Sequence, residues 1–247
     1  MNNPFSLEGK NILVTGASSG IGRATAIECS KYGAHLVITA RNEERLNQTL
    51  QSMEGSDHKM ITADLTYKED IENLVNSIGC LDGIVLCAGI NDKSLIKFIS
   101  GEHLNSMLST NLTGPVNFIQ QIVKKKKLNK GASVVFISSV SAVLPSISNA
   151  MYASTKAAIT QFSKVLALEL MSQRIRVNCI EPSFVETEML KKYALQDSID
   201  EIRNNSPFGR FISPEEVAYT SIYLLSDASQ LVTGTSILID GGFLIKR

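Results

Sequence analysis

Short apolar, β-branched runs alternate with longer amphipathic stretches along the whole chain, and this alternation constrains the fold most. Several of the short runs are apolar on both faces, as strands buried between two helical layers are. The pattern predicts an α/β fold with a doubly wound, mostly parallel, seven-stranded sheet and helices on both faces. The expected strands are 11–15, 36–39, 60–62, 83–87, 133–137, 176–180 and 236–239, and the expected helices are 20–32, 42–53, 67–78, 101–127, 150–173 and 214–226.

No repeat or linker interrupts the 247 residues, so we expect a single domain, 1–247. Lys plus Arg number 24 and Asp plus Glu number 24, so the formal net charge is zero. A chain without excess positive charge lacks the overall electrostatic attraction that binds nucleic acid. We find neither an apolar run of bilayer length nor a signal-peptide pattern at the start, which predicts a cytoplasmic protein without a membrane partner. The histidines stand alone and the four cysteines form no Cys-x-x-Cys pair, so we expect free, buried thiols and no metal site.

A glycine-rich turn follows the first expected strand. A helix beginning there aims unpaired N–H groups and its positive dipole end at an anion such as a pyrophosphate. Such a turn fits a dinucleotide, although a loop that serves packing alone is the alternative. The turn supplies the predicted cofactor-binding residues Gly16, Ser18, Ser19, Gly20, Ile21 and Gly22.

The segment Thr15-Gly-Ala-Ser-Ser-Gly-Ile-Gly22 resembles the cofactor turn of the short-chain dehydrogenase/reductase family. The resemblance extends over nearly the whole chain, from Leu7 to Gly242. It implies a Rossmann-type sheet, a nicotinamide cofactor and a reaction that interconverts a ketone and a secondary alcohol.

The end of the second strand bears on which nicotinamide cofactor binds. An acid there would bind the ribose hydroxyls of NAD(H), but this chain has Ala40 followed by Arg41. An arginine fork suits a 2′-phosphate, which favours NADP(H) over NAD(H). Alternatively, Arg41 is a solvated residue paired with Glu43 and Glu44. By resemblance, Asp64 and Leu65 lie against the adenine, while Asp64 can equally cap the next helix.

Tyr152 and Lys156 form a Tyr-x-x-x-Lys motif on an expected helix, where side chains four residues apart share a face. Ser139 follows the fifth strand, at the edge where such folds bind ligands. A nearby ammonium lowers the pKa of a phenol, so we expect Tyr152 to exchange a proton with the substrate oxygen. The resemblance implies that Lys156 binds the nicotinamide ribose and that Ser139 positions the substrate oxygen. It also implies that Asn111 supports a path for protons to the lysine. An exposed Tyr, a solvated Lys and a capping Ser are the structural alternatives.

The chain departs from the family pattern at two places. Leu86 and Cys87 replace the usual Asn-Asn, although Ala88 and Gly89 keep the close backbone approach to the cofactor. Ser183 replaces a glycine, and it must adopt the backbone conformation of that glycine unless the loop differs. By resemblance, three further residues contact the nicotinamide end of the cofactor, namely Pro182, Val185 and Thr187.

Residues 184–212 resemble the family's substrate lid, and their apolar side chains could line a pocket or pack on the core. The nearest subgroup resemblance is to bacterial 3-oxoacyl-acyl-carrier-protein reductases of fatty acid biosynthesis, which implies a carrier-bound acyl substrate. Another small-molecule carbonyl or alcohol, such as a sugar derivative, and a non-catalytic nucleotide-binding protein remain alternatives. The lysine run 124–127 is either a solvated helix end or a dock for an acidic carrier protein. The apolar ending 243–245 suggests a homotetramer by resemblance.

Overall fold

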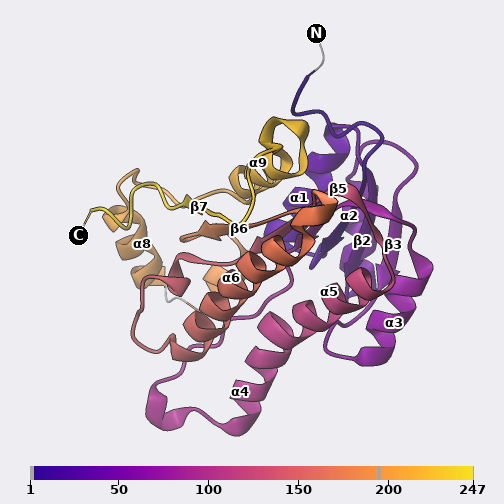
Figure 1. The fold of residues 1–247 in the computed structure, drawn as a ribbon. Helices are drawn as coiled ribbons and strands as arrows, with labels where there is room; N and C mark the ends of the chain where they lie inside the picture. Colours follow the sequence, from indigo (N-terminus) through magenta and orange to yellow (C-terminus); the bar gives the residue numbers. More distant parts are fainter. Residues whose placement is uncertain (1–2, 194–195, 247) are drawn as a thin grey trace.

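The computed structural model describes residues 3–193 and 196–246, and its centre is one seven-stranded sheet (Figure 1). Every neighbouring pair of strands is parallel. The strand order is β3-β2-β1-β4-β5-β6-β7, so the doubly wound fold is confirmed. The strands are β1 (Asn11–Thr15), β2 (His35–Ala40), β3 (Lys59–Thr62), β4 (Leu81–Leu86), β5 (Leu128–Ile137), β6 (Arg176–Pro182) and β7 (Ser236–Ile239).

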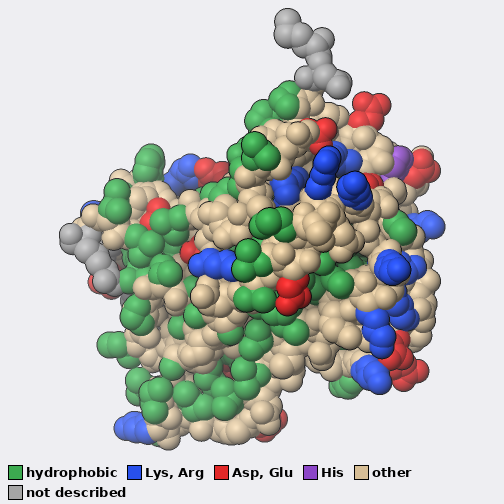
Figure 2. All heavy atoms as spheres, in the orientation of Figure 1, with side chains coloured by type: hydrophobic (Ala, Val, Ile, Leu, Met, Phe, Trp, Pro, Cys, Tyr) green, Lys and Arg blue, Asp and Glu red, His purple; other side chains and the backbone are tan. Residues whose placement is uncertain are grey.

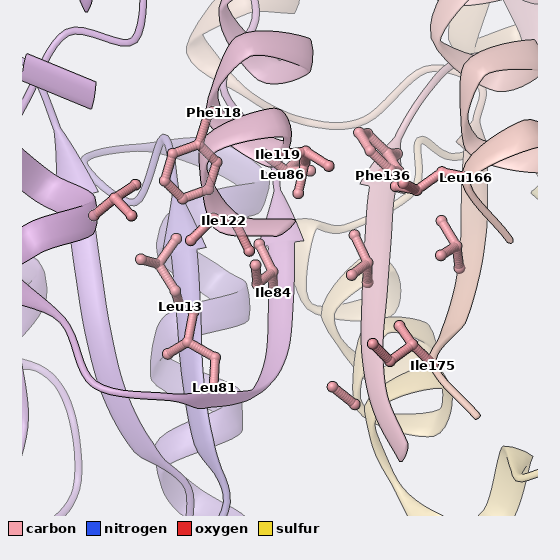
Figure 3. Packing of buried hydrophobic residues seen from close by; sticks show 14 of the residues in the cluster. Leu13, Leu81, Ile84, Leu86, Phe118, Ile119, Ile122, Phe136, Leu166 and Ile175 are labelled. Atoms are coloured by element: carbon pink, nitrogen blue, oxygen red, sulfur yellow. The ribbon is translucent and has the colours of Figure 1, made fainter. Parts of the chain in front are cut away.

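Helices cover both faces of the sheet, because successive residues of its central strands are apolar and point to opposite sides. The helices are α1 (Gly20–Lys31), α2 (Glu43–Gln51), α3 (Lys68–Ser77), α4 (Gly101–Leu108), α5 (Gly114–Lys124), α6 (Ala150–Leu170), α7 (Glu188–Tyr193), α8 (Gln196–Asn205) and α9 (Pro214–Leu225). Leu13 of β1 packs in one buried cluster with α3, α5 and α6, whereas Ile12 and Val14 pack in the other with α1, α2 and α9. Figure 3 shows Phe118 and Ile122 of α5 above Leu13.

None of the helices in the described ranges has the length and apolarity needed to cross a bilayer. The strand order changes direction between β1 and β4, because chain connections run outward from β1 on one side and from β4 on the other. In open parallel sheets, ligands bind beyond the carboxyl ends of the strands at this point. The carboxyl ends of β1 and β4 therefore locate the candidate site.

The predicted helix 101–127 is wrong in one respect, because it is interrupted. α4 ends at Leu108, a π-helical turn spans Ser109–Thr113, and α5 starts at Gly114. Pro115 has no N–H to donate to the preceding turn, so the regular bonding cannot continue through it. Gly114 is required there because a Cβ atom would lie 2.7 Å from the backbone oxygen of Leu65. The break sets the π-helical turn against the loop that follows β3.

Candidate active site

The glycine turn joins β1 to α1 and has no room for a side chain at Gly16 or Gly22. Gly16 has a φ of +64°, and a Cβ atom there would lie 2.8 Å from the backbone nitrogen of Ala88. A Cβ atom on Gly22 would lie 2.3 Å from the backbone oxygen of Gly16. The first N–H groups of α1 have no acceptor within the helix, and Ser19 makes no side-chain capping bond. A ligand can therefore approach the backbone of this turn closely, at the positive end of the helix dipole. This arrangement suits a pyrophosphate.

A cleft of about 340 Å³ opens above this turn. It runs over the carboxyl ends of β1, β2 and β4, and its floor is tied together by Thr15. The Thr15 hydroxyl accepts N–H bonds from Cys87 at 3.1 Å and from Ala88 at 3.3 Å. The predicted residues that line this cleft are Gly16, Ser18, Ser19, Gly20, Ile21, Gly22, Arg41, Asp64, Leu65, Ala88, Gly89 and Thr187.

Arg41 lies at the far end of the cleft, with 62% of its side chain exposed. Its Nη1 is 3.7 Å from Oδ2 of Asp64, and no ion pair joins it to Glu43 or Glu44 in the described part of the chain. The other carboxylate oxygen of Asp64 accepts bonds from the Thr66 N–H and hydroxyl at 2.9 and 2.8 Å. Asp64 thus closes a turn and lines the cleft, but it does not cap α3, whose N-cap residue is Tyr67.

A second cavity, of about 310 Å³, adjoins the cleft at the carboxyl ends of β5 and β6. The two share Ile21, Cys87, Gly89, Thr187 and Met189 as lining residues, so a ligand in the cleft can reach into the cavity. The predicted residues that line the cavity are Ile21, Gly89, Ser139, Tyr152, Lys156, Pro182, Val185 and Thr187.

Ser139, Tyr152 and Lys156 meet where β5 ends beside α6. The Ser139 hydroxyl accepts a bond from the Ser141 N–H at 3.1 Å, which fixes its rotamer. Lys156 Nζ donates to the backbone oxygen of Ile137 at 2.8 Å and lies 5.5 Å from the centre of the Tyr152 ring. A phenol, a hydroxyl and an ammonium at one end of a cavity can bind a carbonyl oxygen and move a proton to it.

The pKa values of the phenol and the ammonium differ from the expectation that the lysine lowers the pKa of the tyrosine. Burial raises the pKa of Tyr152, and a hydrogen bond with Ser139 opposes this only in part. Burial also lowers the pKa of Lys156 to about 8, against which nearby thiols act weakly. The physical reason is that the low-polarity surroundings disfavour the charged form of both groups. The phenol therefore stays protonated at neutral pH.

The lowered pKa of Lys156 predicts a pH-dependent cost to stability. Below pH 8 the folded state holds a buried cation, whereas above the ordinary pKa of 10.5 lysine is neutral in both states. We expect Lys156→Met to raise the free energy of unfolding at pH 7 by about 3 kcal/mol. The gain should shrink as pH rises from 8 to 10.5.

Urea denaturation of the Lys156→Met variant and the wild type across this pH range measures the difference. Lys164→Met, at an exposed position of the same helix, is the control and should change stability little at every pH. A stability gain for Lys156→Met that does not vary with pH would show that packing, and not charge, is responsible.

Asn111 lies in the π-helical turn and lines neither cavity. It is 2% exposed, its Oδ1 accepts the Ile90 N–H at 2.8 Å, and its Nδ2 donates to the Ile90 oxygen at 2.8 Å. A third contact, at 3.3 Å, joins Nδ2 to the Thr155 hydroxyl on α6. The amide therefore fixes the loop after β4 against the helix that carries Tyr152 and Lys156.

The structure accommodates both departures from the family pattern, at Leu86-Cys87 and at Ser183. Ser183 has no positive φ, and its N–H donates to the Ile239 oxygen at 2.9 Å, so this loop does not require glycine. Leu86 is buried in β4 beside Phe136. Burial raises the pKa of Cys87 to about 12, so the thiol is neutral and faces both cavities as a small apolar group.

Sequence reasoning missed several residues that line the two cavities. Arg45 and Glu188 form an ion pair at the edge of the cleft. Asn149, 5% exposed, lines the second cavity with no partner for its Oδ1, while its Nδ2 donates to Ser141. Arg45 could have been predicted from its position one turn into the helix that follows β2. Glu188 could not, because it comes from a distant segment.

The segment 184–212 only partly fulfils its expected role as the wall of a substrate pocket. Met189 and Leu190 line the second cavity. Phe208 and Phe211 instead line a separate cavity of about 240 Å³ near Phe243. The side chain of Tyr193, another apolar residue of this segment, lies outside the described residues.

The lysine run 124–127 lies away from both cavities. It directly precedes β5, whose ten residues span roughly 30 Å and end at the site, so the run lies at the opposite edge of the sheet. Lys125 donates to the Asn76 side chain at 2.6 Å, and Lys127 donates to the Ile78 oxygen at 2.5 Å. These contacts favour a helix end that packs on α3 over a dock for a carrier protein.

Comparisons with known proteins agree with this geometry. The sequence profile of a family described as enoyl-(acyl carrier protein) reductase matches residues 16–244. A 3-oxoacyl-[acyl-carrier-protein] reductase of Thermotoga maritima is 35% identical over 97% of this chain and 99% of its own. Among solved structures, a glucose/ribitol dehydrogenase of the short-chain type from Brucella melitensis has a TM-score of 0.91 at 31% identity, covering 98% of this chain and 99% of its own. An actinorhodin polyketide ketoreductase crystallised with NADPH has a TM-score of 0.88 at 29% identity, with the same coverage. The chain belongs to the short-chain dehydrogenase/reductase family and is an oxidoreductase that acts on carbonyl or alcohol groups.

Proposed function

We propose that this protein is an NADPH-dependent reductase that converts a ketone to a secondary alcohol. The observation that carries the proposal is the meeting of Ser139, Tyr152 and Lys156 in the cavity that adjoins the cleft. The cleft has the backbone cradle for a dinucleotide, and the cavity has space for a small substrate. A nucleotide-binding protein without catalysis would not need this set of polar groups.

The proposed mechanism assigns a step to each of these side chains. The bound nicotinamide supplies the hydride. Ser139 donates a hydrogen bond to the carbonyl oxygen and orients it, and the protonated phenol of Tyr152 gives its proton to the same oxygen as negative charge develops. Lys156 holds the ribose next to the nicotinamide and compensates the charge left on the phenol. Asn111 is a positioning residue, because its amide fixes the loop and the helix on either side.

The remaining predicted contacts belong to the cofactor in this proposal. The N-terminus of α1 and its glycine turn bind the pyrophosphate, and Ala88 and Gly89 allow the cofactor to approach the backbone of the loop after β4. Asp64 and Leu65 lie at the adenine, and Pro182, Val185 and Thr187 at the nicotinamide end. Arg41 binds the 2′-phosphate, which is the basis for NADP(H) over NAD(H).

Arg41→Gln tests the cofactor assignment. We expect kcat/KM for NADPH to fall by roughly 10- to 100-fold, since a charge-assisted contact to phosphate is lost, while kcat/KM for NADH changes little. Arg41→Lys should fall between, because it keeps the charge but not the fork. The measurement is the loss of absorbance at 340 nm with an acetoacetyl thioester. A wild type that prefers NADH, or an equal loss for both cofactors, would overturn the role of Arg41.

For the substrate we propose a 3-oxoacyl thioester, carried on an acyl carrier protein. The cavity has no Asp or Glu among its described lining residues, and Lys93 lies at its edge, which suits a neutral or anionic substrate. Phe184, Met189 and Leu190 supply apolar wall for an acyl chain. Similarity to a glucose/ribitol dehydrogenase keeps a sugar derivative as the second candidate. Comparing kcat/KM for reduction of an acetoacetyl thioester with NADPH and for oxidation of glucose with NADP+ distinguishes the two.

We further propose one domain with 184–212 as a lid, a cytoplasmic location and a homotetramer. Support for the assembly comes from apolar side chains left exposed on α6 and directly after it, with Val165, Leu168 and Met171 each more than half exposed. Ile245 near the C-terminus is 87% exposed. Figure 2 shows such side chains gathered over the half of the molecule that holds α4, α6 and α8. Light scattering should give about four times the 26.9 kDa chain mass, and a monomer mass would contradict the assembly.

A further inference from the structure

A second arginine, Arg45, lines the cofactor cleft. It forms an ion pair with Glu188, which also lines the cleft. Arg45 of α2 donates from Nη2 to Oε1 of Glu188, the first residue of α7. The two residues are 143 positions apart, and both line the same cleft as Arg41. The ion pair therefore connects the helix after β2 with the segment that follows β6.

The position of Arg45 suits it to the phosphate end of the cofactor. It is the third residue of α2, and its N–H donates at 2.8 Å to the side chain of Asn42, the N-cap residue, which also lines the cleft. Arg41 lies just before this cap. Two guanidinium groups and the positive end of a nine-residue helix thus face one region of the cleft.

The ion pair between Arg45 and Glu188 costs little free energy to break, so Arg45 can change its partner. Its side chains are 42% and 66% exposed, for Arg45 and Glu188 respectively, and exposed pairs of this kind contribute little to stability. Arg45 lowers the pKa of Glu188, so the acid stays ionised at neutral pH. A phosphate dianion is a stronger partner for a guanidinium than a single carboxylate.

We propose that Arg45 is a second cation for the 2′-phosphate of the cofactor and that Glu188 competes with this phosphate for it. The inference rests on the proposed use of NADPH and goes beyond the role given to Arg41. Thr187 and Met189, on either side of Glu188, line both cavities. When Arg45 changes its partner from Glu188 to the phosphate, this ion pair no longer connects α7 with α2. The connection is lost at the point where the cofactor and substrate cavities meet.

The test compares the dissociation constants of adenosine 2′,5′-bisphosphate (2′,5′-ADP) and 5′-AMP by calorimetry, since the two probes differ only in the 2′-phosphate. Arg45→Gln should weaken 2′,5′-ADP about 10-fold and leave 5′-AMP unchanged. Glu188→Gln should tighten 2′,5′-ADP several-fold, again with no effect on 5′-AMP, because the competitor has lost its charge. In the double variant, Glu188→Gln should have no further effect, since its target is gone.

Glu186→Gln is the matched control, because it removes one negative charge from an exposed residue two positions away that makes no ion pair with Arg45. Equal tightening by Glu186→Gln and Glu188→Gln would mean a general charge effect and would overturn the competition. An unchanged preference for 2′,5′-ADP in Arg45→Gln would also overturn it, while leaving the NADPH proposal intact. A wild type that binds both probes equally would refute both proposals.

Discussion

Tyr152→Phe is expected to lower kcat for ketone reduction by about 1,000-fold. The substitution removes only the hydroxyl that would protonate the substrate oxygen and keeps the ring that packs beside Lys156. The phenol is protonated at neutral pH and is the proposed proton donor to that oxygen, a role that a phenylalanine ring cannot take. The affinity for NADPH should change less than threefold, since the contact to the ribose comes from Lys156.

Two measurements on Tyr152→Phe separate catalysis from folding. Turnover is followed at 340 nm with an acetoacetyl thioester, and NADPH binding is followed by its fluorescence. Tyr219→Phe, at a half-exposed position of α9, is the matched control and should retain full activity. Retention of more than a tenth of the activity by Tyr152→Phe would remove the phenol from the mechanism.

Gly22→Ala is expected to abolish cofactor binding and to destabilise the fold by about 3 kcal/mol. A Cβ atom at this position lies 2.3 Å from the Gly16 oxygen and 2.7 Å from the Gly16 carbonyl carbon, and both atoms are backbone. No side chain can move aside, so the turn between β1 and α1 has to open. The N–H groups that face the cleft then lose the geometry that binds a pyrophosphate.

Urea denaturation and NADPH titration measure these two effects. Gly101→Ala is the control, because its Cβ atom meets nothing within 4 Å at the start of α4, where alanine favours the helix. Its stability should equal or exceed that of the wild type. A Gly22→Ala protein that binds NADPH normally and keeps its stability would show that the turn tolerates a side chain.

The sheet and the glycine turn could be predicted because their signals are local. Apolar runs on both faces of a strand require cover on both faces, and Gly16 and Gly22 occupy positions that a turn of this kind needs. Tyr152 and Lys156 could be placed together because one helical turn separates them. Ser139 could be added because the carboxyl ends of parallel strands meet at one edge.

What the sequence could not predict depends on contacts between distant segments. The Arg45–Glu188 pair links residues 143 positions apart, and no spacing rule connects them. The rise in the pKa of Tyr152 follows from burial, which only the packed structure reveals. The close approach of Leu65, which requires a glycine at position 114, is likewise a contact between distant segments that a helical pattern does not contain.

The most direct test of the proposed reaction is transfer of the hydride itself. NADPH deuterated at C4, on the side of the ring that the enzyme uses, is incubated with the protein and an acetoacetyl thioester, and the product is analysed by mass spectrometry. The proposal predicts one deuterium on the carbinol carbon of the product for each NADPH oxidised, and about 1,000-fold slower formation of this product with Tyr152→Phe. Oxidation of NADPH without deuterium in the product, from either deuterated face, would contradict it.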